Sequence, residues 1–134
     1  MLNDFRVEYP LIGGYAVAYH GDTRTTGDLD LWVAVDPDNA QSIVEAVGAF
    51  GFAVPNLSVE LFLRPGKIVR MGVAPIRIAI MTSVSGLDFA TAYSSRVDAL
   101  VDGVSVTVIA LEDLKANKRA SGRLKDLDDL DHLP

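Results

Sequence analysis

Residues 11–33 read LIGGYAVAYHGDTRTTGDLDLWV, a stretch with two adjacent glycines, a short apolar run and two aspartates one residue apart. A short apolar strand ends at the adjacent glycines Gly13 and Gly14, and a brief helix over 15–20 stops at Gly21. Residues 28–35 then alternate between acidic or aromatic and aliphatic side chains, which is the period of a strand. The stretch therefore predicts a strand, a tight glycine turn, a short helix and a second strand.

The rest of the chain continues to alternate between predicted helices and strands. Asp36 or Pro37 opens a helix that continues to residue 50, and Asp102-Gly103 marks the turn of a hairpin within 97–110. The other expected elements are extended pieces at 52–56 and 59–66, paired strands at 67–73 and 75–83, and helices at 86–96, 111–121 and 124–133. With no internal repeat or linker, residues 1–134 are expected to form one α+β domain, a mixed β-sheet flanked by helices.

Composition narrows the class of protein. The chain has 134 residues, 49% of them apolar, but no apolar run approaches the ~18 residues that span a bilayer, and its first residues lack the pattern of a signal peptide. We therefore expect a cytoplasmic protein without a membrane partner. The absence of cysteine excludes disulfides and thiolate metal sites, and a net charge of −6 argues against a broad nucleic-acid surface.

The apolar residues that fall on one side of each predicted element are expected in the core. They are Val44, Val47, Phe50, Leu61, Ile68, Ile76, Ile78, Ile80, Leu87 and Phe89. Trp32 shares the face of the aspartates on its strand, so it is expected to pack against a helix, or alternatively to shelter a metal or stack on a base. His20 precedes Gly21 and is expected to act as a cation at the helix C-terminus or as a packing residue.

Asp28 and Asp30 are the first candidates for chemistry. As residues i and i+2 of one strand they point the same way, about 6.6 Å apart at a rise of ~3.3 Å per residue. Their charges repel, so a cation should lie between them, and Mg²⁺ (or Mn²⁺) is suited to hard oxygen ligands. The alternative for an isolated D-x-D is a solvent-facing strand edge, because short motifs match often by chance.

The glycine pair favours a functional interpretation of the D-x-D motif. Gly13 and Gly14 lie between a strand and a helix, where a missing Cβ lets backbone N–H groups approach a phosphate at the helix N-terminus. A simple tight turn is the alternative. A phosphate cradle followed by a metal-binding strand is, however, the combination that nucleotidyl transfer requires.

The segment IGGYAVAYHGDTRTTGDLDLWV resembles the signature of the DNA polymerase β-type nucleotidyltransferase superfamily, in its small bacterial branch of minimal and antitoxin-like members. PIRIAIMTSVSGLDF and LEDLKANKRASGRLKDLDDLDHLP resemble later blocks of that branch. The resemblance implies a nucleotidyltransferase (polymerase β palm-like) fold that binds Mg-NTP across the glycine turn and the carboxylates. It also implies in-line transfer of a nucleoside monophosphate to an acceptor hydroxyl, with release of pyrophosphate.

The resemblance also assigns roles to single residues. Asp28 and Asp30 become the catalytic residues and metal ligands, whereas the nucleotide-binding residues become Gly13, Gly14, Arg24, Thr25, Lys118 and Lys125. Alternatively, Arg24 and Thr25 belong to an ordinary solvated loop, and the basic residues around Gly122 form a solvated helix surface with a pair such as Lys125–Asp129. Asp126 is expected to orient a basic residue.

The sequence departs from the family pattern at Ala79, where a neighbouring strand should supply a third acid. A methyl group can neither hold a metal nor help to deprotonate an acceptor. Glu60 and Asp88 are the acids that could replace it. Two hypotheses follow: an enzyme that transfers nucleotide to a protein, RNA or small molecule, or a degenerate module that binds nucleotide or a partner such as a cognate toxin. A homodimer could cover the flank before the first strand.

Overall fold

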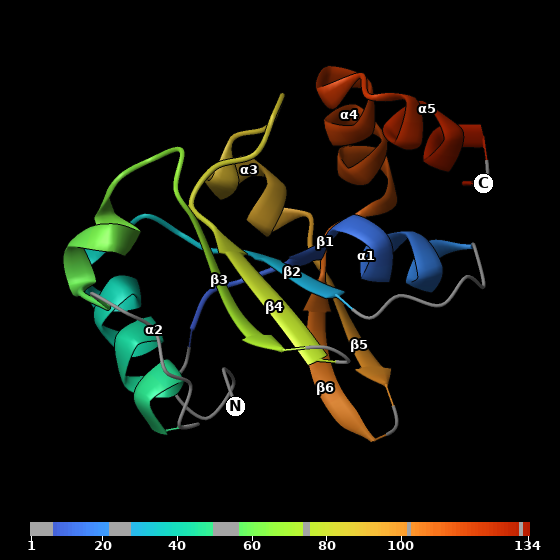
Figure 1. The fold of residues 1–134 in the computed structure, drawn as a ribbon. Helices are drawn as coiled ribbons and strands as arrows, with labels where there is room; N and C mark the ends of the chain where they lie inside the picture. The colour runs from blue at the N-terminus through green and yellow to red at the C-terminus, as the bar shows by residue number, and fades with distance from the viewer. Residues whose placement is uncertain (1–6, 22–27, 50–56, 74–75, 102, 132) are drawn as a thin grey trace.

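A six-stranded sheet forms the centre of the computed structural model, which describes residues 7–21, 28–49, 57–73, 76–101, 103–131 and 133–134 (Figure 1). The strands are β1 (Leu11–Ile12), β2 (Asp28–Trp32), β3 (Ile68–Val73), β4 (Ile76–Met81), β5 (Val97–Val101) and β6 (Val104–Val108). The helices are α1 (Gly13–His20), α2 (Pro37–Ala49), the 3₁₀ helix η2 (Val59–Leu63), α3 (Phe89–Ser94), α4 (Leu111–Ser121) and α5 (Leu124–Asp131).

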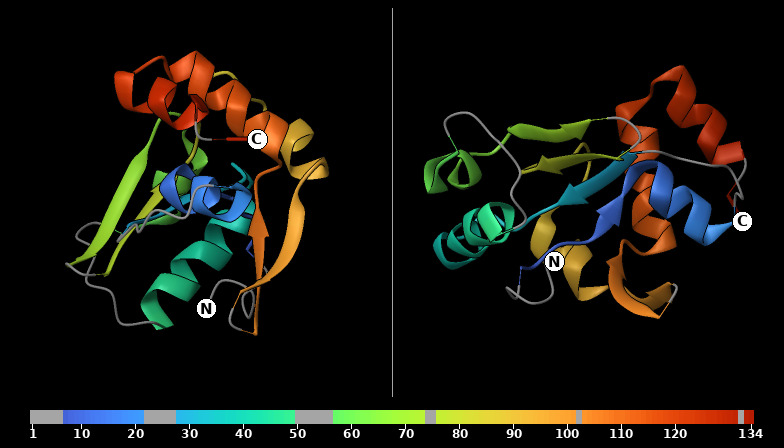
Figure 2. Two further views of the ribbon diagram at one scale, coloured as in Figure 1. Left: turned by 90° about the vertical axis from the view of Figure 1, so that its right-hand side faces the viewer. Right: turned by 60° about the horizontal axis from the view of Figure 1, so that its bottom comes forward.

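The sheet is mixed, as the order of elements predicted. Its strand order is β3-β4-β2-β1-β6-β5. The pairs β1–β2, β3–β4 and β5–β6 are antiparallel, whereas β2–β4 and β1–β6 are parallel. Figure 1 shows α2 and η2 grouped beside β3, with α4 and α5 at the opposite end above α1, and Figure 2 shows the same grouping in two further views. The α+β class with helices flanking a mixed sheet is confirmed.

The core lies on the sheet face that carries the aliphatic residues of β2. Leu31 pairs in register with Ile80 of β4, and both are buried together with Ile43 and Val47 of α2. Of the core residues predicted from sequence, Val47, Ile78 and Ile80 are buried, and a second group is partly buried against the core: Val44, Leu61, Leu87 and Phe89. Phe50 and the side chain of Ile76 lie outside the described residues.

Ile68 contradicts the core prediction, because it is 49% exposed. It begins β3, the edge strand, in register with Met81 on the face opposite the aliphatic core. Alternation predicted that one face of the strand containing Ile68 is buried. The register of β3 against β4 decides which face that is. Ile68 instead lines a cavity described below.

Two element predictions were also wrong in part. Residues 59–63, expected to be extended, form η2, with Phe62 fully buried. Packing of this segment against α2 overrides the strand preference of its β-branched and aromatic residues. The helix expected over 86–96 begins only at Phe89, because Asp88 is its N-cap and accepts a hydrogen bond from the Thr91 amide at 3.2 Å. Residues 52–56 lie outside the described part of the chain.

The break between the last two helices was predicted correctly. Gly122 ends α4 in the left-handed conformation, with φ of 64°, which glycine adopts without a steric penalty. The turn lets α5 fold back against α4. Among the described residues, no helix has the length and apolar character that a bilayer crossing demands.

Candidate functional site

Three side chains lie in one row across neighbouring strands. Asp30 of β2 pairs in register with Ala79 of β4, and Ala79 pairs in turn with Arg70 of β3. Register partners in a sheet point to the same face, so the carboxylate, the methyl group and the guanidinium share the face opposite the aliphatic core. The position predicted for the third acid is therefore directly beside Asp30, as the family pattern implied, and it holds alanine.

Two adjoining cavities, of about 470 and 520 Å³, open on this row. Asp30, Arg70, Met81 and Arg123 line both of them. The first extends toward α4 and the loop after β4, and its further lining is Ile12, Gly13, Ile68, Ser83, Val84, Ser85, Asn117, Lys118, Ser121 and Asp126. The second extends along β3 and β4 to Lys125, and its further lining is Met71, Gly72, Arg77, Ile78, Ala79 and Lys125. Cavities of this size accommodate small organic ligands.

Gly13 is required for the position of Asp30. Its φ of 65° is left-handed, and a Cβ added there would collide with Oδ2 of Asp30. Asp30 is in register with Ile12, the N-cap residue of α1, so its half-buried carboxylate lies at the positive end of that helix. The missing Cβ of Gly13 was predicted to make room for a phosphate at the N-terminus of α1. In the structure it makes room for the Asp30 carboxylate.

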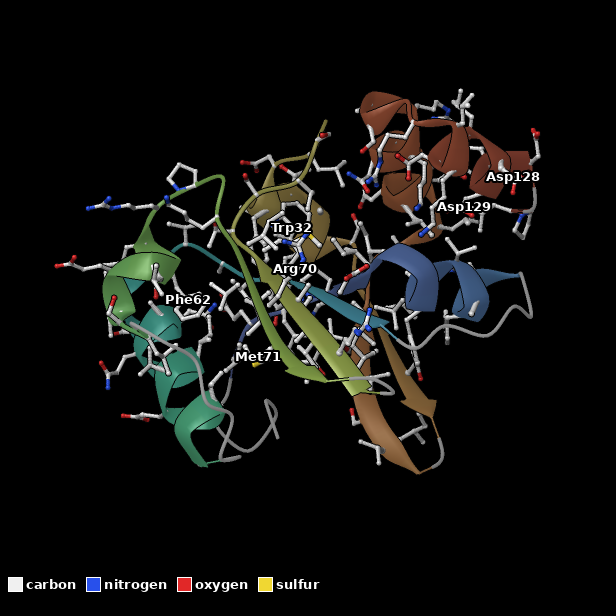
Figure 3. The ribbon with its side chains drawn as sticks, viewed as in Figure 1. Trp32, Phe62, Arg70, Met71, Asp128 and Asp129 are labelled. Atoms are coloured by element: carbon white, nitrogen blue, oxygen red, sulfur yellow. The ribbon has the colours of Figure 1, made fainter. Side chains whose placement is uncertain are left out.

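A buried ion cluster forms the far wall of the first cavity. Lys118 Nζ lies 3.2 Å from Oδ1 of Asp126 and 2.9 Å from Oδ2 of Asp129, with all three side chains buried. The Arg123 guanidinium is exposed and donates to both oxygens of Asp126, at 2.7 and 3.3 Å. Figure 3 shows Asp129 on the inner side of α5 and Asp128 on its outer side. The cluster therefore joins α4 to α5 and holds Arg123 at the cavity.

The cluster changes the pKa values of two of its members. Burial alone would raise the pKa of Asp126, but hydrogen bonds from Arg123 and Lys118, together with their charges, lower it below its ordinary value. The hydrogen bond to Asp126 and the Asp126 charge raise the pKa of Arg123, and the more distant Asp129 and Asp30 charges contribute in the same direction. Arg123 thus stays charged and lies within electrostatic reach of Asp30.

The two predicted lysines occupy different environments. Lys118 lines the first cavity, but its ammonium is bound by Asp126 and Asp129. Lys125 is exposed and lines the second cavity. The suggested pair Lys125–Asp129 is replaced by Lys118–Asp129, because Asp129 points inward toward α4. Asp126 does hold basic residues, as expected from the sequence.

Some of the predicted site falls outside what the structure describes. Arg24 and Thr25 lie outside the described residues, and so does the side chain of Asp28. The backbone of Asp28 begins β2, in register with Arg77 of β4. Gly14 is the second residue of α1, next to Gly13.

The proposed substitutes for the third acid lie elsewhere. Glu60 belongs to η2 and Asp88 caps α3, and neither lines the two cavities beside Asp30. In the part of the chain that the structure describes, no three His, Asp or Glu residues gather to hold a metal ion. Among the described acids, Asp30 is the one that lines both cavities, and a carboxylate combined with phosphate oxygens is a donor set of the kind that Mg²⁺ prefers.

His20 and Trp32 have packing roles. His20 Nε2 lies 2.7 Å from the carbonyl oxygen of Ile109, so the ring ties α1 to the segment that follows β6. Trp32 is buried and packs edge-to-face on Phe89 of α3, with ring centroids 5.1 Å apart. Trp32 lines neither of the two cavities. The prediction that it packs against a helix is therefore confirmed.

Sequence reasoning missed the arginines on β3 and β4. Alternation in residues 68–73 puts Arg70 on the same face as Ile68 and Gly72, but it does not indicate that this face contains the aspartates. Arg77 precedes Ala79 by two residues and so shares its face, which was the available signal. Asn117 was also missed, and its side-chain amide donates to the Ser85 carbonyl at 2.9 Å, fixing α4 against the loop after β4.

Comparisons with solved structures identify the fold. The chain superimposes on a candidate nucleotidyltransferase from Thermotoga maritima with a TM-score of 0.63 and 15% identity, over 97% of this chain and 86% of that one. It also matches an antigenic nucleotidyltransferase-like protein from Paracoccidioides brasiliensis with a TM-score of 0.56 and 20% identity, over 98% and 69% of the two chains. No family model and no curated protein matches the sequence. The chain therefore has a nucleotidyltransferase-like fold.

Proposed function

We propose that this chain binds a nucleoside triphosphate, together with a divalent cation, in the two cavities beside Asp30. The observation that carries the proposal is the meeting of one carboxylate with Arg70 and Arg123 in a cavity of a nucleotidyltransferase-like fold. The chain as a whole is acidic, with a net charge of −6, yet four of the side chains that line the second cavity are basic. A polyphosphate is the ligand class that such a local excess of positive charge attracts.

Asp28 and Asp30 are the residues that would hold the cation, Mg²⁺ or Mn²⁺. A bound ion would screen the two carboxylates from the phosphates of the ligand. The chain itself supplies the walls: Gly13 admits the Asp30 carboxylate, and the buried Lys118 cluster holds Arg123 at the cavity.

Binding without efficient transfer is the form of the proposal that Ala79 supports. Transfer of a nucleoside monophosphate needs a group that takes the proton of the acceptor hydroxyl, and the methyl group beside Asp30 offers none. Turnover, its acceptor, a cognate toxin partner and a homodimer stay predictions. Ala79→Glu tests turnover: if only the third acid is missing, this variant should transfer label from an α-labelled triphosphate where the unmodified chain does not.

The first test of binding is thermal unfolding with Mg-ATP, Mg-GTP, Mg-CTP or Mg-UTP. A ligand at 100 times its Kd adds about 2.7 kcal/mol, which moves the midpoint by several degrees in a domain of this size. Ser121→Trp places an indole in the first cavity and should abolish the shift. Ser95→Trp, at the exposed end of α3 and outside both cavities, is the matched control and should keep it.

Two results would contradict the proposal. One is the absence of any shift with all four nucleotides at millimolar concentration, which would turn attention to a protein partner. The other is an equal shift in Ser121→Trp and the unmodified chain, which would place the nucleotide elsewhere.

A further inference from the structure

Arg70 lies where a guanidinium can reach across Ala79 toward Asp30. Neighbouring strands are about 4.8 Å apart, so two strand intervals separate Arg70 from Asp30 by about 10 Å at the backbone. Both residues point to the same face, and both line the two cavities. Figure 3 shows Arg70 over the middle of the sheet. Since Ala79 ends at Cβ, the space above it is open to a ligand held between them.

Arg77 repeats this arrangement in the next row. It is the register partner of Asp28 across β2 and β4, and it lines the second cavity. Each aspartate of the D-x-D motif therefore has an arginine in its own row of the sheet. A cation was expected beside these aspartates, and guanidinium groups are positive charges that the chain supplies itself.

Three exposed cations line the second cavity. Arg70, Arg77 and Lys125 are exposed, and none forms an ion pair with a carboxylate in the part of the chain that the structure describes. The carboxylate of Asp126, by contrast, is bound by Lys118 and Arg123. Among the described residues, the basic side chains of the cavities that form no ion pair therefore lie on β3, β4 and the start of α5.

We propose that Arg70 binds the polyphosphate group of the nucleotide directly, above Ala79, so that the chain holds this ligand without requiring a divalent ion. The inference rests on the proposed function and specifies how the same site recognises its ligand. A guanidinium presents donors in a planar fork that matches two phosphate oxygens, and it carries its charge at every physiological pH. Arg123 lines the same two cavities, where Nε and Nη2 donate to Asp126 and Nη1 is left to donate to a phosphate oxygen.

The test is calorimetric titration of the chain with ATP and with inorganic tripolyphosphate, each in Mg²⁺ and in EDTA. We expect both ligands to bind in EDTA with a Kd within about tenfold of the Mg²⁺ value. Arg70→Gln should weaken binding in EDTA at least about tenfold, because a charge-assisted contact is lost. Arg64→Gln is the matched control, an exposed arginine outside both cavities, and should bind as the unmodified chain does.

Ala79→Glu provides a second, opposite test. A carboxylate in the row between Asp30 and Arg70 neutralises the guanidinium and repels phosphate, so binding in EDTA should fall at least about tenfold. Mg²⁺ should restore it, because the variant offers a third oxygen donor to the ion. Circular dichroism of each variant checks that the fold is intact.

Three results would overturn the inference: complete loss of binding to the unmodified chain in EDTA, equal affinities of Arg70→Gln and Arg64→Gln, or no change in Ala79→Glu. Any of these, with Mg-ATP still binding, leaves the proposed function standing and removes only the role of Arg70. Failure of Mg-ATP to bind at all removes the proposed function as well. Binding of tripolyphosphate but not ATP would retain the polyphosphate site and overturn its assignment to a nucleotide.

Discussion

Opposite charges lie near each other in two regions of this molecule, and the two regions differ in how far these charges are buried. In the α4–α5 cluster, Lys118, Asp126 and Asp129 are buried, with nitrogen–oxygen distances of 2.9 and 3.2 Å. In the row across β2, β4 and β3, the half-buried Asp30 and the exposed Arg70 share two cavities with a methyl group between them. Buried charges are stable only when they neutralise each other, whereas charges beside a cavity can be left for a ligand.

The difference separates structural charges from charges available to a ligand. Lys118, assigned to the nucleotide from sequence, is held by two carboxylates, whereas Arg70, which sequence reasoning passed over, has an exposed side chain at the cavity. Arg123 belongs to both regions, since it binds Asp126 and lines both cavities together with Asp30. The comparison can be tested by substituting a residue in each region.

The largest expected effect is on the buried cluster. Lys118→Met keeps the length of the stem but leaves Asp126 and Asp129 without the ammonium that they share, and should lower the free energy of unfolding by about 3–5 kcal/mol. Urea unfolding measures this loss. Lys125→Met, at an exposed lysine of α5, should change the free energy of unfolding by less than about 0.5 kcal/mol. Equal effects of the two substitutions would show that the cluster is not a structural ion pair.

The next effect concerns the corner that holds Asp30. Gly13→Ala puts a Cβ into a left-handed backbone and against the Asp30 carboxylate, and should cost about 1–3 kcal/mol. Gly48→Ala is the matched control, because Gly48 lies in α2 with no heavy atom within 4 Å of an added Cβ. It should be neutral or stabilise the chain by up to about 1 kcal/mol. Urea unfolding of both variants measures these changes. If Gly13→Ala does not lower the free energy of unfolding, the close approach of Asp30 to Gly13 is contradicted.

The smallest effect is the acid dependence of the cluster. Because the pKa of Asp126 is lowered on folding, its contribution to stability is complete above its ordinary value near 3.8 and is lost as the pH falls through the lowered value. The free energy of unfolding should therefore fall below about pH 4, less steeply in Asp126→Asn than in the unmodified chain. Asp128→Asn, on the exposed side of α5, leaves Asp126 in place and should keep the full slope. If the free energy of unfolding depends on pH identically in the unmodified chain, Asp126→Asn and Asp128→Asn, the pKa of Asp126 is not lowered by folding.

Most of the fold could be predicted because local pattern and tertiary packing agree. The glycine turn at Gly13, the β5–β6 hairpin and the break at Gly122 depend on backbone conformations that a few residues dictate. Prediction failed where packing decided, as for the 3₁₀ helix at 59–63, whose Phe62 is buried near α2, and for Ile68, exposed on an edge strand. Asp30 and Gly13 were predicted as site residues; the structure places them in contact, and their roles stay predictions.

Most of the helices and strands, the alternation that puts Asp28 and Asp30 on one face of a strand, and the absence of an acid at position 79 could be read from the sequence. Alternation and residue identity are local properties of the chain. The folded structure was needed to show that Ala79 lies between Asp30 and Arg70 and that Lys118 is bound by Asp126 and Asp129. Those relations depend on strand register and helix packing, which join residues far apart in the sequence and are set by the whole core.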